Sequence, residues 1–371
     1  MIVSIAVNAA WNVVNFRLGL IEALLAQGHQ VHVLAPQGPE FAALARLGCV
    51  THALDIDCKG THPVKDFRLM LQLRSCYARI QPDVALHYTI KPVIYGSLAA
   101  RSLGIPALNT ITGLGTAFLS SGWLQAMVKK LYRAALQQAK VVVFQNPDDR
   151  QLFLDTGLLQ AAQAMLIPGS GIDTQRFTPV ALPDQDGRAP VFLLLGRMLR
   201  DKGVVEYVEA ARMLKARCPG ARFALLGFLD VENVSAISRA QMDAWVAEGV
   251  IEYWGETHDV RPMIARADCV VLPSYREGMP RTLLEAAAMA RPLVASDVPG
   301  CREVVEHGVN GMLCQVKSAS ALTQAMANIA ELSPADREVL GAAGRRKVEQ
   351  RFSLNKVIEC YQHAIAVSVA R

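Results

Sequence analysis

Two glutamates eight positions apart lie in the stretch of the chain best suited to chemistry. Glu277 opens a turn, and Glu285 falls inside the helix expected to follow it. The turn 278–280 combines a glycine, which allows a tight bend, with a proline, which favours the first position of a helix. The free N–H groups of Arg281 and Thr282 then point out of the helix start, where an anion binds. The stretch predicts an anion site between two carboxylates that accept hydroxyl groups.

A second loop adds two cations to this stretch. Arg197 and Lys202 follow the apolar run 191–195 and precede a helical pattern. An arginine can hold a phosphate with two donors, and a lysine adds a point charge. A basic loop with Asp201 as a helix cap is the alternative interpretation. Together with the glutamates, the loop favours a sugar-nucleotide site, because a sugar nucleotide has a diphosphate between two hydroxyl-rich sugars.

Short apolar runs typical of strands alternate with helical patterns along the whole chain. Such alternation predicts an α/β fold with parallel sheets covered on both faces. Ligands of these sheets bind at the carboxyl ends of the strands, where both loops begin. The expected strands are 2–7, 30–35, 50–54, 84–88, 107–111, 141–145, 165–168, 191–195, 222–226, 250–254, 268–272, 292–296 and 311–314. The expected helices are 17–27, 66–79, 93–103, 122–138, 147–156, 203–217, 231–248, 260–266, one that starts at Pro280, 334–350 and 353–369.

The length of 371 residues exceeds what one hydrophobic core usually supports, so we expect two domains. A polar, proline-containing stretch at 178–190 interrupts the alternation and predicts a linker. The N-terminal domain is expected over 1–177 and the C-terminal domain over 191–352. Both are expected to be Rossmann-like and doubly wound, and to face a cleft. For the last helix, 353–371, packing back on the first domain is one option.

The composition is that of a folded protein, with 52% hydrophobic and 19% charged residues. Eight scattered cysteines without a C-x-x-C pair indicate reduced core residues of a cytoplasmic protein. We see neither a signal peptide nor an uninterrupted apolar helix, so we expect a cytoplasmic protein or one peripheral on the inner face of the cytoplasmic membrane. The net charge of +5 suits an anionic partner such as phosphate or a membrane surface, and is too small to indicate nucleic acid.

Three blocks, 196–203, 273–285 and 297–305, resemble the family-4 retaining glycosyltransferases of the GT-B architecture. The resemblance spans nearly the whole chain. Within that family, stretches 88–92 and 111–115 are similar to bacterial enzymes that build lipid-linked surface glycans.

The resemblance implies a role for each candidate residue. Arg197 and Lys202 would hold the donor diphosphate, and Glu277 would hydrogen-bond the transferred sugar, so these three are the catalytic candidates. The expected donor-binding residues, with Glu285 on the ribose, are Gly196, Gly278, Met279, Arg281, Thr282 and Glu285. Stabilisation of the leaving diphosphate is then the main catalytic effect, and neither a protein nucleophile nor a cofactor is expected.

The first half departs from the family pattern in two places. The loop 8–12 lacks the glycine pair of many relatives, for which Asn8, Asn15 or Arg17 are candidate substitutes. Where many relatives have an active-site histidine the chain has Tyr88, with His87 one place earlier. Neighbouring strand residues face opposite ways, so the sequence leaves open which of the two faces the site. The candidate acceptor or sugar contacts are Asn15, Arg17, His87, Tyr88, Lys91, Gly113 and Gly115.

No metal site is expected. The pairs Asp55/Asp57 and Asp184/Asp186 match the D-x-D pattern of metal-using sugar transferases, but that motif belongs to a different fold, and a two-acid match is frequent by chance. The histidines form no ligand cluster.

Apolar residues recur at helical spacing over 122–138, with Lys129, Lys130 and Arg133 between them. A surface helix that buries one face explains this pattern. A helix that lies on anionic lipid explains it as well, and the uncharged loop 112–121 is then placed to meet a lipid-linked acceptor.

The sequence therefore predicts a glycosyltransferase that moves a hexose or N-acetylhexosamine, with retention, from a nucleoside-diphosphate sugar expected to carry UDP. The expected acceptor, a polyprenyl-diphosphate-linked saccharide, comes from the resemblance alone. A sugar-nucleotide epimerase on the same plan and a non-catalytic sugar-nucleotide sensor are the alternatives. A dinucleotide dehydrogenase fits poorly, because no G-x-G-x-x-G follows either leading strand.

Overall fold

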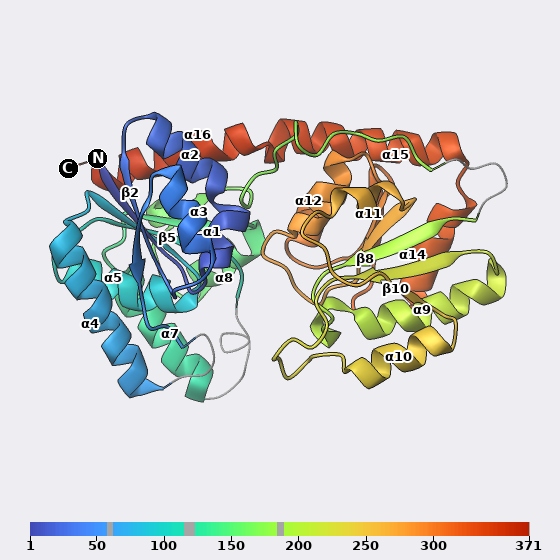
Figure 1. Ribbon diagram of the computed structural model, residues 1–371, viewed down its shortest axis with the longest axis horizontal. Helices are drawn as coiled ribbons and strands as arrows, with labels where there is room; N and C mark the ends of the chain where they lie inside the picture. Colours follow the sequence, from blue (N-terminus) through green and yellow to red (C-terminus); the bar gives the residue numbers. More distant parts are fainter. Residues whose placement is uncertain (58–61, 115–122, 184–188, 371) are drawn as a thin grey trace. The chain divides into compact units, whose positions relative to one another are not determined.

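The computed structural model describes residues 1–57, 62–114, 123–183 and 189–370, which form two compact α/β units (Figure 1). The first unit comprises Met1–Gly171 and Leu354–Arg371, and the second comprises Ile172–Ser353. All strand pairs within the two described sheets are parallel. The expectation of two parallel-sheet α/β domains is therefore confirmed.

The first unit is built on a sheet with the described strand order β3-β2-β1-β4-β5-β6-β7. Helices cover both faces, and the central strands are buried almost without interruption, as parallel strands are when both faces are covered. The strands are β1 (Ile2–Ala6), β2 (Gln30–Ala35), β3 (Val50–Ala53), β4 (Val84–Tyr88), β5 (Ala107–Ile111), β6 (Val141–Phe144) and β7 (Ala164–Leu166). The helices are α1 (Ala10–Phe16), α2 (Leu18–Ala26), α3 (Glu40–Leu47), α4 (Pro63–Ile80), the π-helix η1 (Pro92–Gly96), α5 (Ser97–Arg101), α7 (Trp123–Leu136), α8 (Pro147–Asp155), the 3-10 helix η2 (Ala161–Gln163) and α16 (Leu354–Val369).

The second unit is built on a sheet with the described order β10-β9-β8-β11-β12-β13. One face packs against α9, α10 and α14, and the other against α11, α12 and α13. The strands are β8 (Val191–Leu195), β9 (Arg222–Leu226), β10 (Glu252–Tyr253), β11 (Cys269–Leu272), β12 (Leu293–Ser296) and β13 (Gly311–Cys314). The helices are the 3-10 helix η3 (Arg200–Lys202), α9 (Val204–Arg217), α10 (Arg239–Ala247), α11 (Arg261–Ala265), α12 (Arg281–Ala288), α13 (Cys301–Val304), α14 (Ala319–Glu331), α15 (Pro334–Lys347) and the π-helix η4 (Val348–Phe352).

Residues from Ile172 onward belong to the second unit, although the sequence analysis assigns them to the first domain and a linker. The buried Arg291 holds this segment, because its guanidinium donates to the carbonyl oxygens of Val180 at 2.7 Å and Ala181 at 3.0 Å. Arg345 likewise donates to the carbonyl oxygen of Phe177 at 2.6 Å. The helix α16 packs on the first unit and adds several residues to its core: Val357, Tyr361, Ala364 and Ile365.

Some helix boundaries differ from expectation for local reasons. The helix α10 begins at Arg239, eight residues after the expected start at 231, because Ser238 caps it by accepting a hydrogen bond from the Gln241 N–H at 3.2 Å. The short helix α1 was not expected. Its N-cap is Ala9, whose side chain makes no capping hydrogen bond, so the sequence has no start signal there.

Candidate active site

The candidate donor site lies on three loops of the second unit. They follow β8, β11 and β12, which are neighbours in the sheet, so their carboxyl ends lie at one edge. Backbone hydrogen bonds join the loops: the Tyr275 N–H donates to the Asp201 carbonyl at 2.9 Å, and the Glu277 N–H donates to the Pro299 carbonyl at 3.3 Å. The segments that the sequence analysis links by chemistry are therefore in direct contact.

Two glycines make this close contact possible. Gly203 has a φ of +74°, and a Cβ there would lie 2.2 Å from the Pro273 carbonyl oxygen. Gly300 has a φ of +79°, and a Cβ there would lie 2.7 Å from the carbonyl oxygens of both Glu277 and Gly278. Only a residue without a side chain fits such positions without displacing backbone. Neither glycine was expected to have this role from the sequence.

The carboxylate of Glu277 is held by two donors. Lys202 forms an ion pair with its Oε1, and the Ser274 hydroxyl donates to the same oxygen at 2.5 Å. The side chains of Lys202 and Glu277 are 24% and 13% exposed, so both can still be reached by a ligand. The structure thus brings two of the catalytic candidates together. Ser274 is a site residue that the sequence analysis missed, because a lone serine after a strand carries no signal.

The helix α12 starts one residue later than expected. Pro280 is its N-cap rather than its first residue, so the first N–H groups of the helix are those of Arg281 and Thr282. Glu285 is 8% exposed and accepts a hydrogen bond from the Arg281 Nε at 2.7 Å. Burial raises the pKa of the Glu285 carboxyl, and the Arg281 charge opposes this shift. Glu285 leads an apolar run, and this bond gives its buried carboxylate a charged partner.

The remaining donor candidates line the same loops. Arg197 is exposed. A Cβ on Gly196 would meet nothing within 4 Å, so the space in front of this residue is open. Gly278 and Met279 are half-buried, and Met279 packs against the apolar cluster beneath the site.

In the first unit, the structure corrects the assignment of His87. Its ring is fully buried and bonded to the Tyr77 hydroxyl and the Asn109 Oδ1, each at 2.9 Å. A Cβ on Gly96 would lie 2.6 Å from its Nε2, so the ring fills the space beside that glycine. Burial lowers the pKa of His87 to about 4. His87 is therefore a neutral core residue and not an acceptor contact.

Tyr88 faces the opposite side of the sheet and is also fully buried. Its ring lies under the guanidinium of Arg17, whose central carbon is 4.0 Å from the ring centroid. The sequence left open whether His87 or Tyr88 faces the site. In the structure neither side chain is exposed, because α16 and α4 cover the two faces of β4.

The other candidates of the first unit differ in their surroundings. Lys91 forms a largely buried ion pair with Asp66, with 2.7 Å between Nζ and Oδ1, so its charge is already matched. Asn15 is exposed, and its Nδ2 donates to the Trp11 carbonyl at 2.9 Å. Gly113 is half-buried with a φ of +137°, and Gly115 lies outside the described residues.

Of the two D-x-D pairs, Asp55/Asp57 lies within the described residues and Asp184/Asp186 does not. The described residues contain no group of three histidines, cysteines or acids able to hold a metal ion. Asp57 pairs with Lys65 at 3.0 Å, and Asp184 and Asp186 lie outside the described residues.

The apolar face of α7 packs on the first unit, through Val128, Tyr132, Ala135 and Leu136. Arg133 donates to the carbonyl oxygens of Thr156 at 3.1 Å and Gly157 at 3.2 Å. Packing therefore explains the helical spacing that the sequence analysis also relates to a membrane. At the start of the helix, Trp123 is 75% exposed. Within the described residues, no helix is both long and apolar enough to span a bilayer.

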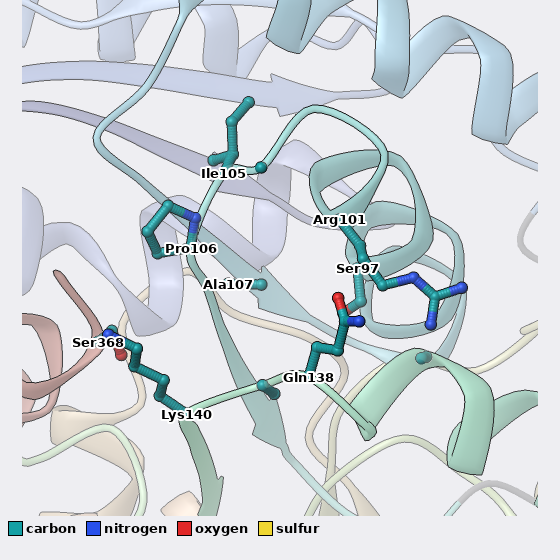
Figure 2. Close-up of a pocket in the computed structure, with 11 residues that line it drawn as sticks. Ser97, Arg101, Ile105, Pro106, Ala107, Gln138, Lys140 and Ser368 are labelled. Atoms are coloured by element: carbon teal, nitrogen blue, oxygen red, sulfur yellow. The ribbon is translucent and has the colours of Figure 1, made fainter. Parts of the chain in front are cut away.

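A cavity of about 290 Å³ lies in the first unit near the amino ends of β5 and β6 (Figure 2). Its two cations already have carbonyl partners, since Arg101 donates to Ala134 at 3.0 Å and Lys140 donates to Ala370. Ligands of parallel sheets bind at the carboxyl ends of the strands, so this cavity lies at the opposite edge.

The fold is that of the glycosyltransferases of the GT-B architecture. Residues 3–146 match the family described as "Glycosyl transferase 4-like", and residues 189–331 match "Glycosyl transferases group 1". These two matches together cover most of the chain, and they confirm the resemblance to family-4 glycosyltransferases seen in the sequence.

Two enzymes are similar over most of their length. The N,N'-diacetylbacillosaminyl-diphospho-undecaprenol alpha-1,3-N-acetylgalactosaminyltransferase of Campylobacter jejuni is 26% identical over 87% of this chain and 88% of its own. The UDP-Gal:alpha-D-GlcNAc-diphosphoundecaprenol alpha-1,3-galactosyltransferase of Escherichia coli is 22% identical over 81% and 80%.

Solved structures share the fold. A glycosyltransferase from Rickettsia africae superposes with a TM-score of 0.80, at 18% identity, over 100% of this chain and 99% of its own. HepE of Anabaena in complex with UDP and glucose superposes with a TM-score of 0.76, at 17% identity, over 98% and 99%. At this identity the likeness concerns the fold alone.

Proposed function

We propose that the protein transfers a hexose or N-acetylhexosamine from a UDP-sugar to a polyprenyl-diphosphate-linked saccharide, with retention of configuration. The observation on which this rests is the Lys202–Glu277–Ser274 cluster beside the start of α12. The cluster offers a cation and an oriented carboxylate within two touching loops, next to the first N–H groups of α12. Both relatives named above act on saccharides linked to diphospho-undecaprenol, which supports the acceptor class.

In this proposal the donor diphosphate lies against Lys202, Arg197 and the first N–H groups of α12. Lys202 is paired with Glu277 before the donor binds, and the diphosphate then competes for its ammonium group. Glu277 accepts hydrogen bonds from hydroxyls of the transferred sugar, and the buried Glu285 accepts them from the ribose. Charge that develops on the leaving diphosphate is stabilised by groups already in place, which is usually the largest contribution to catalysis.

The proposed step exchanges one bond at the anomeric carbon for another. The bond from this carbon to the β-phosphate oxygen breaks, and a bond to the acceptor hydroxyl oxygen forms on the same face of the sugar. The hydroxyl proton passes to the leaving phosphate oxygen. The step uses no cofactor other than the donor itself and needs no nucleophile from the protein.

A panel of nucleotide sugars tests this function. We expect nucleotide release that requires both one UDP-sugar and a lipid-linked acceptor. Conversion of the donor sugar without an acceptor would indicate an epimerase instead. Tight donor binding without turnover on any acceptor would indicate a sensor.

We further propose that the start of α7 contacts anionic lipid on the cytoplasmic face of the membrane. The support is the exposed Trp123 with the exposed Lys130 on the same helix, since aromatic and basic side chains favour the membrane interface. Arg133 is left out of this surface because it caps carbonyls of its own unit. The double change Trp123→Ala and Lys130→Glu is expected to release the protein from anionic vesicles, whereas Arg346→Glu, at an exposed position of α15, is not. Equal release by both variants would contradict the proposal.

A further inference from the structure

Arg17 lies between two helices at the carboxyl edge of the first sheet. It separates α1 from α2, with a φ of −127° and a ψ of −1° that interrupt the helical path. The helix α1 follows directly from β1, and Tyr88, which Arg17 covers, is the last residue of the neighbouring strand β4. Arg17 is therefore placed at the edge where parallel sheets bind their ligands.

The side chain of Arg17 is enclosed but not satisfied. It is 3% exposed, and its Nε has no hydrogen-bond partner in the described part of the chain. The guanidinium is 4.0 Å from the ring centroid of Tyr88 and 5.9 Å from that of Tyr361 on α16. These rings stabilise the cation and fix its plane, but they accept no strong hydrogen bond from it.

The other buried arginines of the described chain donate hydrogen bonds to several backbone carbonyl oxygens. Arg291 donates to four carbonyl oxygens at 2.7 to 3.1 Å. Arg337 donates to the carbonyls of Ile329 at 3.0 Å and Ala330 at 2.8 Å. Arg17 has no such set among the described residues, although burial of a cation is costly unless hydrogen bonds compensate it. Its donors are therefore available to a ligand.

We infer that Arg17 is a diphosphate-binding residue of the first unit. The planar guanidinium matches two phosphate oxygens, and the adjacent start of the nine-residue helix α2, which has no acid in its first turn, also favours negative charge. The inference rests on the proposed function, in which two diphosphates occur, one in the donor and one in the acceptor. The donor and the acceptor both present diphosphate oxygens to a guanidinium, so the experiment measures binding of each separately.

The experiment measures binding of two probes to the full chain by calorimetry. UDP represents the donor diphosphate, and farnesyl diphosphate represents the acceptor, with farnesol as its uncharged match. The variants are Arg17→Gln and Arg17→Lys, and the control is Arg68→Gln, at an exposed arginine of α4. We expect Arg17→Gln to weaken one of the two diphosphates by about tenfold to a hundredfold, which is what charged hydrogen bonds contribute. Arg17→Lys is expected to restore part of the affinity, whereas farnesol binding and the control stay unchanged.

Weaker UDP binding alone assigns Arg17 to the donor, and weaker farnesyl diphosphate binding alone assigns it to the acceptor. Unchanged affinity for both in folded variants overturns the inference. If neither variant folds, a structure of the wild-type protein with each probe decides. We expect a phosphate oxygen within hydrogen-bond distance of Arg17. Phosphate held only by Lys202 overturns the inference. Binding needs no turnover, so an enzyme that is inactive on every acceptor would refute the proposed function without deciding this inference.

Discussion

The position of His87 in the core leads to a quantitative prediction on pH and stability. Its native pKa is lowered to about 4 by burial, compared with 6.5 for an ordinary histidine. As the pH falls, the His87 ring of the unfolded chain is protonated before that of the folded chain. The contribution of His87 to the free energy of unfolding is therefore fully present above pH 6.5 and is lost between pH 6.5 and pH 4. For these two values the loss at pH 5 is about 2 kcal/mol, rising to about 3 kcal/mol below pH 4.

The assay is urea unfolding of the wild-type protein and of His87→Asn at pH 7 and pH 5. Asparagine removes the titrating ring and keeps a polar side chain beside Tyr77 and Asn109. We expect the difference in unfolding free energy between the two pH values to shrink by about 2 kcal/mol in the variant. Other partly buried histidines, His32 and His52, are the same in both proteins and cancel.

The matched control is His363→Asn, at an exposed position of α16, which is expected to keep the pH dependence of the wild type. An unchanged pH dependence in His87→Asn would refute the reasoning. So would a loss of turnover at pH 7 in a variant that is as stable as the wild type, because it would place His87 at the reacting groups.

Three further predictions concern the second unit. Lys202→Ala and Glu285→Ala are each expected to lower turnover by roughly a hundredfold or more while circular dichroism stays unchanged, because each removes a preorganised donor-site contact; near-normal rates in both would remove the donor-site assignment. Gly300→Ala is expected to destabilise the protein by about 1 to 3 kcal/mol, since the new Cβ meets two carbonyl oxygens at 2.7 Å at a positive φ, and an unchanged melting temperature would contradict the packing of these loops. Arg291→Met is expected to cost about 2 kcal/mol or more in urea unfolding, because the variant leaves the buried carbonyls of Val180 and Ala181 without a donor, and Arg346→Met is the exposed control.

Most of the fold follows from the sequence because its strands are short, apolar and separated by helical patterns. Every described strand lies at an expected position to within two residues at each end. The helix α14 was missed although it has signals: Ser318 caps it, and Leu322, Met326 and Ile329 recur along its buried face. The start expected for α10, at residue 231, was wrong. The composition of the polar segment before Ser238 does not distinguish a turn from a helix.

The contact between the candidate donor loops was largely predictable because its signals lie in local sequence. Glu277, Glu285 and Lys202 are each placed by a strand end and a helix start, which are short-range signals. The burial of His87 was not predictable. The alternation of side chains along a strand shows that His87 and Tyr88 point to opposite faces of the sheet, but it does not show which helix covers each face. The same holds for Arg17, whose burial depends on Tyr361, a residue more than three hundred positions away.

A structure with UDP bound decides whether the second unit holds a sugar-nucleotide diphosphate between Lys202 and the start of α12. We expect phosphate oxygens within hydrogen-bond distance of the Lys202 Nζ and of the first N–H groups of α12, with the ribose hydroxyls on Glu285. UDP bound away from these groups, with Lys202 still paired to Glu277, would contradict it.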